Sequence, residues 1–420
     1  MTRSGAARSS TRPGGSRRDF RRFWFAGAAD QLGSHAAAVA LPLLVLSAGG
    51  GPTVAGLTGT CAAGAQTLWS PAAGVLADRY PRRRTMVLAA TVAACSAAAV
   101  TVLVALGRIS LPLITAATVL QGTAAATYGA AAAGAARAVL PERDLEGPLA
   151  ALRARDQAVQ LVGPGLGGVL FQIGRWVPFL LDAVSCLVAA VCVRSVRSEL
   201  RPHELTGAGG ARPARAGFRR DLVEGLAFLF GSPLLRFVAV WSAGINLVFG
   251  VLYYHVVLQA RLHGASSASI GLVLTIAGTG GLVGALLVPV VLPRVRAGTI
   301  VRHTCWWTVV LSVALALTTS TVAYGFLLSS LFLVSPALSV VFQTRTVLQT
   351  PDGLQGRVGT ALKTVGEGTA ALAPLLAGLL VEHCDGPGTA VLVGALTAGL
   401  ACYSTRNARL LEPRPPAGSH

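Results

Sequence analysis

The stretch Gly74-Val-Leu-Ala-Asp78-Arg79-Tyr-Pro-Arg82-Arg83-Arg84 places a glycine, an acid and a basic run between two long apolar segments, 54–77 and 86–106. A helix crosses the hydrocarbon core of a bilayer with roughly 20 consecutive apolar residues, and both segments are long enough for that. The polar residues between them leave room for only a short turn outside the bilayer. The stretch therefore predicts two membrane helices joined by a tight, basic loop.

The composition extends this prediction to the whole chain. Of the 420 residues, 53% are hydrophobic and only 12% are charged, whereas a soluble domain carries about a quarter charged residues. Apolar runs recur along nearly the whole length, and surface scaling does not allow one soluble core to hold them all. We predict an all-α membrane protein with twelve transmembrane helices in two six-helix pseudo-repeats, with spans near 23–47, 54–77, 86–106, 111–136, 157–174, 177–193, 235–260, 269–292, 302–320, 322–344, 363–381 and 389–405.

The positive charge lies in short clusters between the apolar runs. With the N-terminus inside, every Lys and Arg except Arg108, Arg175 and Arg261 falls on the cytoplasmic side, and such asymmetry sets membrane topology. We therefore predict both termini in the cytoplasm. Arginine replaces lysine almost everywhere and Ala and Gly abound, which favours a bacterial inner membrane. The net charge of +18 would suit nucleic acid, but no folded polar domain presents it, so we expect no such partner.

The chain divides at its longest polar segment, which lies near the middle. The predicted parts are a disordered cytoplasmic N-terminus (1–19), a first six-helix bundle (20–193), a cytoplasmic linker with an amphipathic helix over 218–230 (194–234), a second six-helix bundle (235–405) and a cytoplasmic tail (406–420). Similar residues recur in both halves at one spacing: Ala151 with Ala361, Pro164 with Pro374, and Gly168 with Gly378. Parallel repeats of this size relate the halves of one large class of transporters.

Sequence motifs for cofactors or covalent chemistry are absent. The seven cysteines show no CxxC or Cys/His metal spacing, and buried thiols behave as small hydrophobes. The run Gly278-Thr-Gly280-Gly-Leu-Val-Gly284 lies inside an apolar segment, so its small residues indicate helix packing rather than a dinucleotide site. No GxxxxGK[S/T] sequence is present. We expect no cofactor, no metal and no enzymatic activity.

The loop at 74–84 resembles the GxxxDRxGRR signature of the Major Facilitator Superfamily, with Pro81 where the signature has glycine. The resemblance implies a latch on the cytoplasmic side whose ionic contacts change during transport. The glycine is expected to allow close helix approach, and the acid can accept bonds from arginine or a helix N-terminus. A plain basic loop is the alternative. The predicted latch residues are Gly74, Asp78, Arg79, Arg82 and Arg83 here, and Arg345, Asp352, Gly356 and Arg357 in the corresponding loop of the second half.

A second motif lies in the fifth span. Gly163-Pro164-Gly-Leu-Gly167-Gly168 resembles the GPxxGG end of the motif associated with antiporters in this superfamily. The proline removes a backbone donor and bends a helix, and the glycines allow tight helix contact. The upstream glycine of the motif is replaced by Val159. A rocking point for alternating access and a purely structural kink are both open interpretations.

Three further strings resemble the branch of the family that contains the enterobactin exporter. They are Ala40-Leu-Pro-Leu-Leu-Val45, Leu180-Leu-Asp182-Ala-Val-Ser185 and Pro351-Asp352-Gly-Leu-Gln-Gly356-Arg357-Val358. This resemblance implies efflux of a small organic molecule driven by proton entry. One feature departs from it, because the RxxQG signature of many proton-coupled members reads Thr118-Val-Leu-Gln121-Gly122 and lacks the arginine.

Ionisable and polar residues inside predicted spans are costly and are functional candidates by default. The candidates for proton or substrate binding are Asp30, Ser34, His35, Gln121, Tyr128, Asn246, Tyr253 and Glu367. Each has a structural alternative: an ion pair for Asp30, a local pair with Lys363 for Glu367, and interhelical hydrogen bonds for His35 and Asn246. Asp182 is predicted near the outer end of the sixth span, as a cap or outer gate.

The combined prediction is a secondary active transporter, with a small-molecule substrate, protons and the lipid bilayer as its partners. Two bundles rock around a central cavity, so that ligand and proton shift the balance between two states. An importer or facilitator on the same fold is one alternative. A membrane scaffold or sensor that transports nothing is the other.

Overall fold

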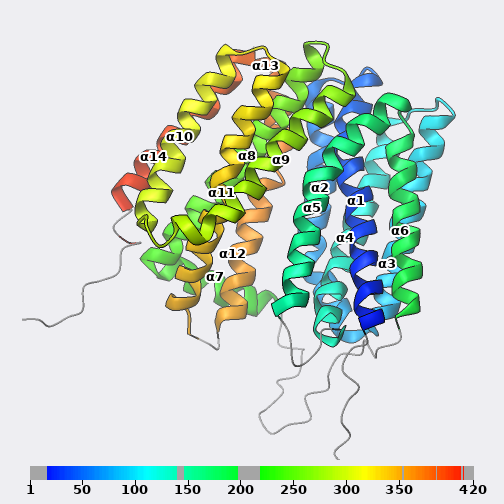
Figure 1. The fold of residues 1–420 in the computed structure, drawn as a ribbon, viewed down its shortest axis with the longest axis horizontal. Coiled ribbons are helices and arrows are strands. Elements are labelled where there is room, and N and C mark those ends of the chain that lie inside the picture. The colour runs from blue at the N-terminus through cyan, green and yellow to red at the C-terminus, as the bar shows by residue number, and fades with distance from the viewer. Residues whose placement is uncertain are drawn as a thin grey trace, which may run out of the picture.

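The computed structural model describes residues 17–139, 146–196, 218–351, 354–384, 386–407 and 410. Within these ranges all regular structure is helical. The first half consists of α1 (Arg17–Ser47), α2 (Pro52–Arg79), α3 (Arg82–Ala105), α4 (Leu111–Val139), α5 (Glu146–Ile173) and α6 (Val177–Ser195). Figure 1 shows these six helices side by side as one bundle.

The second half repeats this arrangement after a short helix. Its helices are α7 (Phe218–Gly231), α8 (Pro233–Leu262), α9 (Ser267–Val291), α10 (Ala297–Leu317), α11 (Thr321–Gln349), α12 (Gln355–Ala370), α13 (Ala373–His383) and α14 (Gly386–Asn407). Because α12 and α13 follow one another along one path (Figure 1), each half contains six long helical segments. The predicted all-α fold with two six-helix halves is confirmed.

The helices begin where the sequence supplies suitable first-turn residues. Proline stands in the first turn of α2, α6 and α8, where its missing N–H would have had no helical partner. Ser266 caps α9 by accepting a bond from the N–H of Ser269, and Ser320 caps α11 in the same way. In a bilayer each backbone polar group must be satisfied within the protein, which is why long helices suit this apolar sequence.

Large apolar side chains lie both inside and outside the bundles. Phe23, Met86 and Tyr128 are buried in the first half, and Phe237 and Trp241 in the second. Other large apolar residues are exposed all along the helices: Leu68, Leu88, Val191, Leu286, Leu317 and Leu348. Eight of the described helical segments are long and apolar enough to cross a membrane. An apolar exterior on such helices identifies a multi-pass membrane protein.

The two halves touch through glycine and proline residues. We call the end where α1 begins, next to the α2–α3 turn at Tyr80 and Pro81, the basic end, and the opposite end the far end. In α5 and α9, Gly168 lies against Ser267 and Gly271. In α2 and α13, Gly56 and Gly59 lie against Pro374, and Gly378 lies against Pro52. These close approaches belong to the parts of the four helices nearer the far end, so small residues join the halves there.

The structure differs from two sequence predictions. The helix predicted to start near residue 23 begins at Arg17, inside the segment predicted to be disordered; the rest of that segment lies outside the described residues, as do most of the linker and the tail. The eleventh span is two helices, α12 and α13, separated at Ala371 and Leu372, just before Pro374, which cannot donate a helical hydrogen bond. The amphipathic helix α7 packs against α12 and α8, with Leu229 fully buried, so protein covers part of its apolar face.

Candidate functional site

A buried carboxylate lies in the middle of the first half. Asp182, on α6, has no exposed surface. Its carboxylate accepts hydrogen bonds from the Gln121 amide on α4 and from the Ser34 hydroxyl on α1, the latter at 3.4 Å. Three helices therefore meet at this side chain. Asp182 lies five residues after the start of α6 at Val177 and faces the interior of the bundle, where these hydrogen bonds give it a structural setting. A role in outer gating stays a prediction.

A thiol links Asp182 to the second intramembrane acid. Cys186 Sγ lies 3.8 Å from Asp182 Oδ1 and 4.0 Å from Asp30 Oδ1. Within the described residues, neither carboxylate forms an ion pair with lysine or arginine at 4.0 Å or less. We call Asp30, Ser34, Gln121, Asp182 and Cys186 the acidic cluster. Asp30, Ser34 and Gln121 were predicted candidates that the fold brings together, whereas the role of Cys186 was missed because a thiol in an apolar run gives no sequence signal.

A neighbouring ion pair joins two adjacent residues of α5. Arg155 on α5 pairs with Asp156 at 2.7 Å, and the Gln31 amide donates to the same carboxylate at 3.0 Å. The guanidinium is buried against α1, where a side chain at Gly27 would collide with Arg155. The charged run of Arg153, Arg155 and Asp156 in the sequence favours such an ion pair. Arg155 thus forms its ion pair with Asp156, and no ion pair within 4.0 Å is formed between Arg155 and the two carboxylates of the acidic cluster.

Beside the α2–α3 loop, one predicted latch residue forms a hydrogen bond to α4. Arg82 donates to the carbonyl of Gly134 on α4 at 3.1 Å, whereas Asp78 and Arg79 are exposed. A Cβ atom at Gly74 would meet nothing within 4 Å. The expected close helix approach at this glycine is therefore wrong in this conformation, because its hydrogen faces open space. Arg83 is partly buried beside the loop.

The corresponding loop of the second half makes a different contact. Arg357 on α12 pairs with Glu224 of α7 at 2.6 Å, and Gly225 lies against the carbonyl of Arg357. Arg345 is half-buried at the end of α11 and Gly356 is exposed. Asp352 lies outside the described residues. Sequence reasoning had placed Arg357 in a loop latch and did not connect it with α7.

The glycines of α5 make the close contacts that were predicted. A Cβ atom at Gly163 would lie 2.6 Å from that of His35 on α1, and one at Gly167 would collide with Ala36. Gly168 touches Gly271 of α9 in the other half. Helix α5 continues through Pro164. One short segment therefore contacts both α1, which carries the acidic cluster, and the opposite half.

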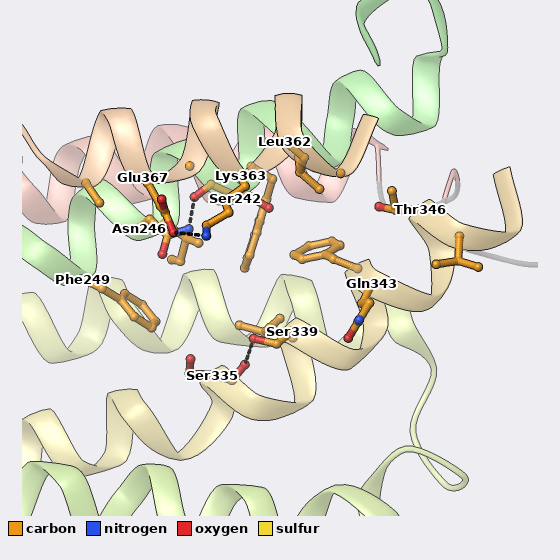
Figure 2. A pocket seen from close by; sticks show the side chains of 18 of the residues that line it. Ser242, Asn246, Phe249, Ser335, Ser339, Gln343, Thr346, Leu362, Lys363 and Glu367 are labelled. Atoms are coloured by element: carbon orange, nitrogen blue, oxygen red, sulfur yellow. Dashed lines mark hydrogen bonds and ion pairs between the residues drawn. The ribbon is translucent and has the colours of Figure 1, made fainter. Parts of the chain in front are cut away.

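A cavity of about 660 Å³ lies in the second half. Its walls come from α8, α11 and α12: Trp241, Ser242, Ile245, Asn246, Phe249, Ser335, Leu338, Ser339, Phe342, Gln343, Thr346, Val347, Thr350, Gln355, Gly359, Leu362, Lys363, Gly366, Glu367 and Ala370. Figure 2 shows Asn246, Lys363 and Glu367 gathered on one side, opposite Ser335 and Ser339. We call it the second-half cavity.

Two of the predicted candidates line this cavity and the others do not. Asn246 and Glu367 belong to its wall. His35 contacts α5, Tyr128 is buried in the core of the first half, and Tyr253 packs against Tyr254 with ring centroids 5.6 Å apart. His35 and Asn246 therefore lie at different sites. Within the described residues no group of three His, Cys, Asp or Glu side chains could hold a metal ion.

Two six-helix halves related as parallel repeats, which meet at the far end, are the architecture of one large class of membrane transporters. The chain belongs to the Major Facilitator Superfamily, whose family model matches residues 23–374. It is therefore a membrane transporter of that type. No curated protein sequence matches the chain.

Solved structures give the same fold at low sequence identity. The nucleoside transporter NupG, as its D323A mutant, has a TM-score of 0.73 and 10% identity, covering 94% of this chain and 100% of its own. A bacterial homologue of the iron transporter ferroportin, in an inward-facing state, has a TM-score of 0.72 and 19% identity over 93% and 98%. A bacterial homologue of the lysosomal transporter Spinster, also inward-facing, has a TM-score of 0.70 and 14% identity over 96% and 100%.

Proposed function

We propose that this transporter exports a small organic molecule from a bacterial cytoplasm in exchange for protons. The proposal puts the basic end and both termini in the cytoplasm, because positive residues are retained on that side of a membrane. The far end, where the halves touch, then closes the path to the outside. In the exchange cycle the contacts at the far end separate, and the cavity becomes accessible from the other side.

The acidic cluster is the observation on which the proposal of proton coupling rests. Asp182 accepts hydrogen bonds from Gln121 and Ser34, and Asp30 lies 4.0 Å from the Cys186 thiol. Neither acid forms an ion pair with lysine or arginine in the described part of the chain. An ionised carboxylate away from water is costly unless a cation or enough donors compensate it. When the carboxylate is protonated in one state and ionised in the other, the free-energy cost of the buried charge differs between the two states. Coupling requires such a difference.

The path from the acidic cluster to the interface supports the same proposal. Asp30 lies on α1, and His35, five residues further along that helix, touches Gly163 of α5. Five residues further along α5, Gly168 touches Gly271 of the second half. A shift of α1 that follows proton binding can therefore displace the helix that forms the interface, because packed helices move as rigid elements.

Export rests on the resemblance of three strings, in 40–45, 180–185 and 351–358, to the branch containing the enterobactin exporter. The partial antiporter motif at 163–168 favours the same direction. Import or facilitated diffusion on the same fold would need neither a proton gradient nor this direction of flux.

Everted membrane vesicles test the proposal. A panel of fluorescent dyes, antibiotics and siderophores is offered to vesicles with the native chain, Asp30→Asn or Asp182→Asn. We expect an acid-inside gradient to drive accumulation of at least one compound, and each variant to abolish the dependence on the gradient. Asp156→Asn is the matched control, since it removes a carboxylate that already pairs with Arg155.

Each outcome of the vesicle experiment has a defined meaning. Transport of a compound by the native chain without any effect of the gradient contradicts proton coupling and identifies a facilitator. Flux in the opposite direction contradicts export. If Asp30→Asn and Asp182→Asn both keep the full gradient dependence, the acidic cluster does not carry the proton.

A further inference from the structure

The second-half cavity has the size and lining of a small-molecule site. Its volume, about 660 Å³, lies within the range of roughly 300–1,000 Å³ found for ligand pockets. Trp241, Phe249 and Phe342 supply aromatic surface, and Ser242, Asn246 and Gln343 supply uncharged polar groups. Such a wall suits a molecule with an apolar body and a compact polar head.

The charges in this wall balance one another. Among the residues that line the cavity, Lys363 and Glu367 are the only Lys, Arg, Asp or Glu residues. Lys363 Nζ lies 3.6 Å from Glu367 Oε1, and the side chains are 67% and 52% exposed. Figure 2 shows both side chains near Asn246 on the same side of the cavity. The site therefore has one positive and one negative group side by side and no net charge.

The ion pair between Lys363 and Glu367 is weak, so a charged ligand can replace it. The two residues are four apart on α12, and exposed pairs of this kind contribute little to stability because water screens both charges. A ligand that offers a carboxylate to Lys363 and a cation to Glu367 replaces one weak contact with two. A ligand with a single charge satisfies one residue and repels the other, which disfavours it in a partly desolvated site.

We propose that the second-half cavity selects zwitterionic, amino-acid-like molecules with an apolar side group. The ligand's carboxylate binds Lys363, its ammonium binds Glu367, and its apolar group lies against Phe249 and Phe342. This inference rests on the proposed transport function and adds the substrate class. The ammonium and the carboxylate of an amino acid are carried by one carbon atom, so both reach a pair of residues that lie within 3.6 Å of each other.

Asn246 completes this recognition. Its amide Nδ2 donates to the carbonyl of Ser242 at 2.7 Å, so its orientation is held and Oδ1 is directed elsewhere. An amide oxygen accepts hydrogen bonds, and beside Glu367 it adds a second acceptor for an ammonium group.

Equilibrium binding of four related probes tests this inference. The purified full chain, in lipid nanodiscs without a proton gradient, is titrated with L-phenylalanine, phenethylamine, 3-phenylpropanoate and 3-phenylpropanamide. These probes share a phenyl group and are zwitterionic, cationic, anionic and neutral. We expect L-phenylalanine to bind at least about tenfold more tightly than each of the others, a difference of ~1.4 kcal/mol.

Two charge-neutralising variants give a reciprocal pattern that a purely structural role would not produce. Lys363→Gln should weaken L-phenylalanine and 3-phenylpropanoate but not phenethylamine, whereas Glu367→Gln should weaken L-phenylalanine and phenethylamine but not 3-phenylpropanoate. Arg406→Gln, at the exposed end of α14, is the control and should change none of them.

Three results overturn the inference: equal binding of the neutral and zwitterionic probes, equal loss of all probes in both variants, or no binding of any probe. Because this assay involves neither transport nor a gradient, its failure leaves proton coupling to be decided by the vesicle experiment. Loss of coupling in vesicles would likewise leave the charge selectivity of the cavity standing.

Discussion

The backbone N–H of Thr53, at the start of α2, donates a 2.8 Å hydrogen bond to Glu382 Oε2 near the end of α13. This bond joins the two halves at the far end. The first N–H groups of a helix have no partner within it, and they favour a carboxylate. Beside it, the N–H of Leu375 donates to the Thr60 hydroxyl at 3.0 Å, because the break between α12 and α13 frees that N–H. Two bonds and a set of glycine contacts thus hold the far end closed.

Glu382→Ala should loosen the far end. The substitution leaves the first turn of α2 without its acceptor, so amide hydrogen exchange over residues 53–60 should quicken, while Glu382→Gln, which retains an acceptor oxygen, should have a smaller effect. Hydrogen exchange read by mass spectrometry measures this. His383→Ala is the neighbouring control, and equal exchange in all three variants would show that the carboxylate does not hold the halves together.

Gly168→Leu should prevent the halves from closing. Its side chain would occupy the space of Ser267 and Gly271, and overpacking of this kind costs about 1–3 kcal/mol. We expect lower thermal stability and faster hydrogen exchange at the α5–α9 contact. Gly281→Leu, on α9 in open space, is the matched control and should remain close to the native chain. A Gly168→Leu protein with native stability and exchange would contradict the contact.

Gly74→Ala should be tolerated although it alters the loop signature. A Cβ atom there meets nothing within 4 Å, and alanine favours a helix over glycine by up to ~1 kcal/mol. Thermal unfolding should therefore show equal or slightly higher stability. If stability is native but gradient-driven flux falls, the glycine is needed for close approach in the alternate state; a marked loss of stability would mean that the open space is not there.

Asp182→Ala should destabilise the first half more than Asp182→Asn. Alanine leaves the Gln121 amide and the Ser34 hydroxyl without their acceptor, and an unsatisfied buried polar group costs about 1–3 kcal/mol. The two bonds go to Oδ1 and Oδ2 respectively, so asparagine, which retains one oxygen, can keep one of them. Thermal unfolding in detergent gives the comparison, with Ser339→Ala on α11 as a control in the other half. Equal stability of the two Asp182 variants would refute the hydrogen-bonding role.

Removal of the ion pair between Arg357 and Glu224 should weaken the contact between α7 and α12. The two side chains are 31% and 38% exposed, so a double-mutant cycle with Arg357→Gln and Glu224→Gln should give a coupling free energy of ~0.2–1 kcal/mol. Limited proteolysis near α7 should speed up in each single variant. Strictly additive effects would show that the pair is not coupled.

Part of the candidate site followed from the sequence because single residues identified it. Asp30, Gln121, Asn246 and Glu367 stood out as polar groups in apolar runs, and such groups rarely occur in spans without a role. Their grouping could not be predicted from spacing. Asp30 and Gln121 are far apart along the chain and share the acidic cluster only because α1, α4 and α6 pack together. His35 and Asn246, both candidates from the sequence, lie at different sites.

The sequence by itself determined that this chain spans a membrane with helices in two similar halves, because the length of apolar runs and the placement of arginines are local properties that the bilayer selects directly. Only the tertiary structure decided that Gly168 rather than Gly74 makes a close helix contact, that Arg357 pairs with Glu224, and that the cavity lies within the second half. Those outcomes depend on which helix faces meet. In an apolar chain the faces of a helix are nearly uniform in hydrophobicity, so the packing of small residues decides which faces meet.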